Sequence, residues 1–127
     1  MILTGLIIAL LAAALHVFIF YIESFAWTTK GISVFGLTPE SAAQTKEMAY
    51  NQGFYNLFLG IIAAVGAIFF LAGSSSVGLA LMIAGVGSMF AAAAVLFLSS
   101  PDKRSAALKQ GTLPLLSLIF LALGALI

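Results

Sequence analysis

The sequence predicts an all-α integral membrane protein, a bundle of four transmembrane helices. Of the 127 residues, 63% are hydrophobic and only 7% are charged, whereas a soluble domain has about 45–50% apolar and about 25% charged residues. Four apolar stretches are also long enough to cross a hydrocarbon core, which requires about 20 residues per helix. The composition therefore excludes a water-soluble monomer and makes the lipid bilayer the expected surroundings.

Charge and cysteine content exclude further classes of protein. The net charge of +1 leaves no basic surface for a phosphate backbone, so we expect no nucleic-acid partner. Because the chain has no cysteine, it has no disulfide, no thiolate ligand for zinc or an iron–sulfur cluster, and no cysteine nucleophile.

We expect a single transmembrane domain over residues 1–127. Its predicted spans cover about residues 2–27, 48–72, 77–99 and 108–127. The first lacks the basic n-region of a signal peptide, so we expect it to be retained. Polar or helix-breaking residues close the first three, and the last contains Pro114, which a membrane helix tolerates when its neighbours satisfy the freed carbonyl.

Thr38, Pro39 and Glu40 are typical of a helix start, since Thr caps, Pro fits the first position and Glu favours the positive end of the dipole. The second helix is therefore expected to begin outside the membrane, roughly two and a half turns before its apolar stretch. The alternative is a separate interfacial helix with a bend near Ala49. We expect the preceding segment, Ile32 to Leu37, to lie at the headgroup level.

The basic residues predict the orientation. They fall in two loops only and are Lys30, Lys46, Lys103, Arg104 and Lys109. Four spans place these two loops on one side of the membrane, and the positive-inside rule makes that side cytoplasmic and both termini external.

Helical periodicity predicts which face of each span lies inside the bundle. Polar and small residues are expected there, because small residues allow close helix packing and polar groups avoid lipid. The first helix presents Gly5, Ala9, Ala12, His16, Phe20, Glu23 and Trp27 on one stripe; the second presents Gln52, Tyr55, Asn56, Leu59 and Ala63, with Asn51 at the edge. The third has a ladder of Ala80, Ala84, Ser88 and Ala92, and the fourth has Gln110, Pro114, Ser117, Leu121 and Gly124.

These faces predict a polar pocket that opens toward the cytoplasm. Glu23 is expected about 6 Å inside the cytoplasmic end of its helix and His16 roughly 16 Å inside, near the midplane. The candidate residues for binding a proton or a ligand are His16, Glu23, Asn51, Gln52, Tyr55, Asn56 and Gln110. We assign no catalytic residue among them.

Each candidate also has a structural interpretation. Glu23 is a functional candidate because it lies within a span, but it could instead reach the interface and pair with Lys30 or Lys109. His16 could be a neutral imidazole satisfied by a neighbouring carbonyl or hydroxyl, and the amides could simply join helices. Seven residues separate His16 from Glu23, about 10 Å along one face, which suits a bridging water, a bridging ligand or a proton relay.

The same residues make a poor metal or cofactor site. One histidine, one carboxylate and several amides are not the ligand set that zinc or iron prefers. A single histidine also excludes bis-histidine haem within one chain, and no G-x-S-x-G motif indicates a hydrolase. We expect neither a metal nor another cofactor.

Several motifs together resemble a known family. They are the run His16 to Thr29, the segment Phe35 to Glu40, the run Asn51 to Leu59, and Gln110, Gly111 and Pro114. They are similar to the bacterial membrane-protein family catalogued as domain of unknown function 1304, across essentially the whole chain. The resemblance implies a small four-span protein of the bacterial inner membrane and implies no mechanism.

Three functional hypotheses follow. The leading one is a membrane-embedded binder or transporter of a small molecule, with Glu23 and His16 handling a proton or polar headgroup. Since four helices can hardly enclose a full pathway, it includes a homodimer or larger homo-oligomer. The alternatives are an intramembrane enzyme, with isomerase-like acid/base chemistry on a lipid-like substrate, and a non-catalytic assembly partner.

Overall fold

The computed structural model describes all 127 residues and is 90% helical, without strands. In chain order its elements are α1 (Ile2–Phe25), α2 (Lys30–Phe35), α3 (Pro39–Leu71), α4 (Ser75–Ser99), the short 3-10 helix η1 (Pro101–Lys103) and α5 (Arg104–Leu126). Four of the helices are long and apolar enough to cross a membrane. The predicted all-α four-helix bundle is therefore confirmed.

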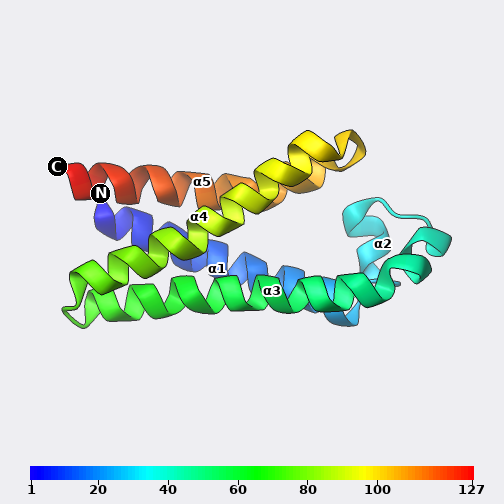
Figure 1. Ribbon diagram of the computed structural model, residues 1–127, viewed down its shortest axis with the longest axis horizontal. Helices are drawn as coiled ribbons and strands as arrows, with labels where there is room; N and C mark the ends of the chain where they lie inside the picture. The colour runs from blue at the N-terminus through cyan, green and yellow to red at the C-terminus, as the bar shows by residue number, and fades with distance from the viewer.

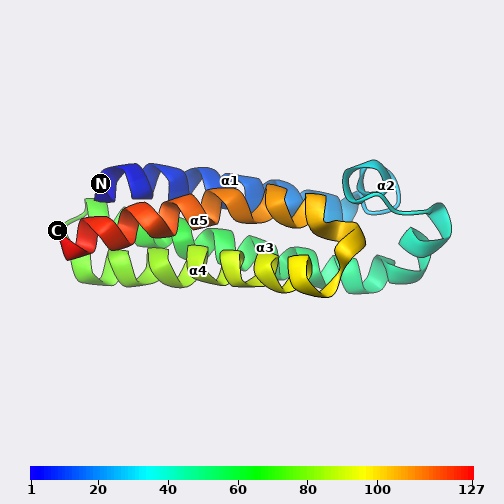
Figure 2. The same ribbon diagram turned by 90° about the horizontal axis from the view of Figure 1, so that it is seen from above.

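The four long helices run side by side along the length of the molecule (Figures 1 and 2). α1 and α4 each pack against both α3 and α5, so the four helices surround a common core. Both termini lie at one end together with the short α3–α4 turn, and α2 and the loop between α4 and α5 lie at the other (Figure 1). All five basic residues belong to this second end, which we call the basic end.

α3 is one continuous helix of 33 residues. At its start the Thr38 hydroxyl accepts a hydrogen bond from the Ser41 backbone N–H at 3.1 Å, and Pro39 occupies the first position. At about 1.5 Å per residue the helix is about 50 Å long, whereas the hydrocarbon core is about 30 Å thick. α3 accordingly extends past the other helices at the basic end (Figure 1), and the alternative of a separate interfacial helix is wrong.

The loop expected at headgroup level contains a helix that the sequence did not predict. α2 ends at Gly36, whose φ of 65° is the left-handed conformation that glycine adopts without strain. Phe35 is buried in a cluster that also holds Ile22 of α1 and Ala106 of α5. The Trp27 indole N–H donates to the Thr45 hydroxyl of α3 at 3.0 Å. Contacts from this connection therefore reach α1, α3 and α5 at the basic end.

Small residues bring the helices of the core together. The main apolar cluster comprises Leu6, Ala9, Ala12, Ala13, Ala63, Ala67, Met82, Val86, Met89 and Leu121. At the α3–α4 contact, a Cβ atom added to Gly78 would lie 2.6 Å from the carbonyl oxygen of Gly66. The two backbones thus approach more closely than any side chain would allow.

The prediction for the α4 face is wrong, and glycine explains why. Its expected ladder of Ala80, Ala84, Ser88 and Ala92 is exposed on the outside of the bundle. The buried residues are Gly78, Met82, Gly85, Val86, Met89 and Ala93. Glycines permit closer backbone approach than alanines, so the face with Gly78 and Gly85 turns inward.

Candidate functional site

Glu23 is the only charged side chain that is buried, at 8% exposed, and it lies in the last turn of α1 at the basic end. Asn56 of α3 donates a hydrogen bond from its Nδ2 atom to the Oε1 atom of Glu23. The only ion pair in the chain joins Lys103 and Asp102 at 3.4 Å, on the exposed surface. Glu23 therefore has an amide partner and no basic partner, neither Lys30 nor Lys109.

The close approach of α1 and α3 brings this pair together. Gly53 precedes Asn56 by about one helical turn, and a Cβ atom added to it would lie 3.1 Å from both the Phe20 carbonyl oxygen and the Ser24 nitrogen. The Ser24 hydroxyl donates to the Tyr50 carbonyl of α3 at 2.9 Å. These contacts hold Glu23 opposite Asn56. The sequence analysis does not include Ser24 among the candidate residues. Its position next to Glu23 and its small polar side chain could have indicated this contact between helices.

Asn56 is itself oriented by its own helix. Nδ2 also donates to the Gln52 carbonyl at 3.3 Å. Both hydrogens of the amide nitrogen are thereby directed, one along α3 and one toward Glu23. The carboxylate thus meets a positioned donor.

His16 lies deeper on the same face of α1 and is 2% exposed. Its Nδ1 atom is 2.9 Å from the Ala12 carbonyl oxygen of the preceding turn. The spacing along α1 keeps it about 10 Å from Glu23. No hydrogen bond joins the two side chains, so a relay between them requires a bridging molecule.

The other candidates do not join Glu23 in one pocket. Asn51 and Gln52 are exposed, and Tyr55 is 64% exposed, so the predicted inner face of this helix is wrong at these positions. The buried residues of α3 are instead Ala42, Ala49, Gly53, Gly60, Ala63, Gly66 and Ala67. Asn51 and Gln52 lie beside the last turn of α1, but Gly53 is the residue that faces it, so both amides are left exposed.

Gln110 belongs to a different environment. It is half-buried and, with Lys109, lines a cavity of about 100 Å³ whose other walls are apolar residues of α1, α2 and α5, among them Phe18, Ile22 and Phe35. Elsewhere the predicted faces hold. Gly5, Ala9, Ala12, His16 and Glu23 of α1 are buried, as are Pro114, Ser117 and Leu121 of α5.

These features define a small multi-pass membrane protein with one buried carboxylate near the basic end of the bundle. Residues 10–122 match the family model described as "Protein of unknown function (DUF1304)", and the chain belongs to that family. The resemblance based on the His16, Asn51 and Gln110 motifs is thereby confirmed. No curated protein and no solved structure matches the chain.

Proposed function

We propose that this protein binds a small molecule at an intramembrane site centred on Glu23 and takes part in its transport, exchanging it for a proton. The supporting observation is a buried carboxylate whose one hydrogen-bond partner is the neutral amide of Asn56. An unpaired charge inside a membrane protein is costly, so ionisable residues there typically mark proton or ligand paths. Either a proton on Glu23 or a positively charged group of the ligand beside it would remove this cost. Binding of one therefore releases the other, which is the exchange that we propose.

Two further features support transport. Glu23 lies at the end of the bundle that carries every basic residue, which the positive-inside rule assigns to the cytoplasm. His16, deeper on the same face, is the next buried titratable group along α1 toward the membrane centre. In this proposal the protein lies in the bacterial inner membrane, and a second copy contributes to the pathway, because four helices enclose little space.

An intramembrane enzyme has less support. Acid/base chemistry on a lipid-like substrate needs one cavity that reaches both His16 and Glu23 and takes an acyl or ring system, whereas proton exchange needs access to Glu23 alone. The cavities of about 310 and 400 Å³ have neither residue in their walls. The third hypothesis is a non-catalytic assembly partner. Burial of His16 fits a structural role for that residue, but such a role does not explain a buried carboxylate without a basic partner. We therefore favour binding and transport.

Carbodiimide labelling tests the chemical state of Glu23. Dicyclohexylcarbodiimide is apolar and reacts with protonated carboxyl groups that are reached from lipid. In protein reconstituted into liposomes, we expect peptide mass spectrometry to find the adduct on Glu23 and not on the exposed Glu40, Glu47 or Asp102. An unlabelled Glu23 would contradict the proposal.

Transport is tested with the same liposomes, loaded with a pH-sensitive dye and exposed to a panel of small organic cations. We expect at least one cation to drive proton movement through the wild-type protein. Glu23→Gln should abolish this movement, and Glu47→Gln, the same change at an exposed position of α3, should retain it. Equal fluxes in the wild type and in Glu23→Gln would show that Glu23 carries no proton.

A further inference from the structure

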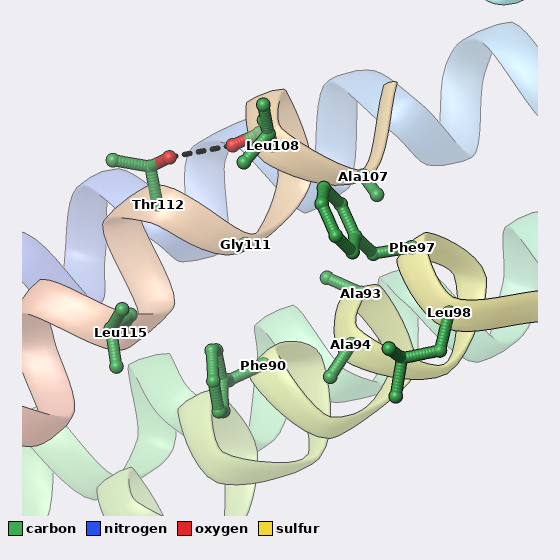
Figure 3. A pocket seen from close by; sticks show the side chains of 10 residues that line it. All are labelled: Phe90, Ala93, Ala94, Phe97, Leu98, Ala107, Leu108, Gly111, Thr112 and Leu115. Carbon is green, nitrogen blue, oxygen red and sulfur yellow. Dashed lines mark hydrogen bonds between the residues drawn. The ribbon is translucent and has the colours of Figure 1, made fainter. Parts of the chain in front are cut away.

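An apolar groove lies between α4 and α5, apart from Glu23. Its volume is about 310 Å³. Figure 3 shows Ala93 of α4 facing Gly111 of α5, with the ring of Phe97 reaching from α4 toward Ala107. For comparison, an apolar cavity of about 150 Å³ binds benzene. The groove therefore has room for a segment of a hydrocarbon chain.

The lining offers a ligand no free hydrogen-bond donor. Thr112 is its one polar side chain, and the Thr112 hydroxyl already donates to the Leu108 carbonyl at 2.6 Å (Figure 3). A ligand portion inside the groove must therefore be hydrocarbon. A polar portion has to lie outside, at the mouth.

Arg104 supplies that polar mouth. Its Nε–H donates to the Phe97 carbonyl at 3.0 Å, and its guanidinium carbon lies 4.7 Å from the centre of the Phe97 ring, which is a wall of the groove. Fixing Nε leaves the two terminal amino groups of the guanidinium as donors, a geometry that suits phosphate oxygens. Lys103 and Lys109 lie near it in the chain, with Asp102 as the one acidic neighbour.

We propose that this groove binds an acyl chain of an anionic phospholipid, with the lipid phosphate on Arg104. An apolar groove that ends at Arg104, on the predicted cytoplasmic side, is complementary to such a lipid in both shape and charge. A second copy of this chain is a poorer occupant. Its own basic end would bring like charges toward Arg104 in a parallel arrangement, whereas an anionic headgroup neutralises them.

Native mass spectrometry of the delipidated protein in detergent tests the proposal. We expect dioleoylphosphatidylglycerol to be retained more strongly than dioleoylphosphatidylcholine, which carries the same chains without net charge. One basic residue near a membrane surface changes anionic-lipid affinity by about fivefold, so Arg104→Gln should weaken phosphatidylglycerol binding by about that factor. Lys46→Gln, the same loss of charge on the α3 extension, should bind as the wild type does.

Two further arms test the acyl chain. Ala94→Leu should fill the groove and weaken binding, while Ala92→Leu, the same change on the exposed face of α4 outside the groove, should not. The second arm varies the lipid and needs no substitution in the protein. The wild type should bind dihexanoylphosphatidylglycerol more weakly than the dioleoyl lipid, because the shorter chains fill less of the groove.

The possible contrary outcomes are distinct. Equal retention of the two dioleoyl lipids, or of phosphatidylglycerol by the wild type and Arg104→Gln, would overturn the headgroup contact. Displacement of the lipid by equimolar inorganic phosphate, or equal binding of short and long chains, would show a phosphate site without a chain site. A dimer that excludes the lipid would assign the groove to a second copy.

Discussion

Gly78→Ala should separate α3 from α4 and destabilise the bundle. The new Cβ atom would lie 2.6 Å from both the Gly66 carbonyl oxygen and the Phe70 Cα atom. Both neighbours are backbone atoms and cannot rotate away. The Phe70 nitrogen is closer still, and ordinary contact begins near 3.4 Å, so α4 must move away by at least about 0.8 Å, and a gap of this size loses about a quarter to a half of each contact's attraction.

The expected magnitude follows from two opposing effects. Overpacking of this kind costs about 1–3 kcal/mol, and the immovable backbone favours the upper part of that range. Alanine recovers up to about 1 kcal/mol through its higher helix propensity. We therefore expect Gly78→Ala to lower the free energy of unfolding by about 1–2 kcal/mol.

The matched control lies on the same helix. A Cβ atom added to Gly87 meets only the Leu118 Cδ2 atom, at 3.8 Å, so Gly87→Ala should be neutral or stabilising by up to about 1 kcal/mol. Unfolding in mixed micelles of increasing dodecyl sulfate content, followed by circular dichroism, measures both variants. If Gly78→Ala proved as stable as Gly87→Ala, the close backbone contact would not exist in the protein.

Two more substitutions test polar contacts. Ser117→Ala removes the hydroxyl that donates to the Gly5 carbonyl at 2.8 Å and should cost about 0.6 kcal/mol, up to about 1.7; the same unfolding assay should find no loss for Ser88→Ala, which is exposed. Thr38→Ala removes the cap that accepts from Ser41 and should weaken the first turn of α3 by about 1 kcal/mol. Faster hydrogen exchange confined to that turn would show it, and unchanged exchange would argue against a capping role.

The sequence predicts the number and extent of the long helices well, because each membrane-spanning helix requires a long apolar stretch and helix-breaking residues mark where the stretch ends. It also predicts the inner face of α1. On that helix the small residues Gly5 and Ala9 and the polar residues His16 and Glu23 lie on the same side, so close packing and the exclusion of polar groups from lipid favour one orientation.

The inner faces of α3 and α4 are harder to predict. Lipid is as apolar as the protein core, so hydrophobic residues do not distinguish an inner from an outer face. On α4 two stripes of small residues compete, and only the three-dimensional fit to α3 selects Gly78 and Gly85 over Ala80 and Ala84. On α3, the close contact of Gly53 with Phe20 and Ser24 of α1 selects the inner face and leaves Tyr55 64% exposed.

The two proposed sites occupy different helix pairs at the same end of the bundle, and this makes them separable. Glu23 and Asn56 join α1 to α3, whereas Arg104 and Phe97 lie at the α4–α5 groove. Arg104→Gln should therefore leave carbodiimide labelling of Glu23 unchanged, and Glu23→Gln should leave retention of phosphatidylglycerol unchanged. Coupling between the two readouts would instead indicate that the lipid controls the packing of all four helices, and that the carboxylate responds to the bundle as a whole.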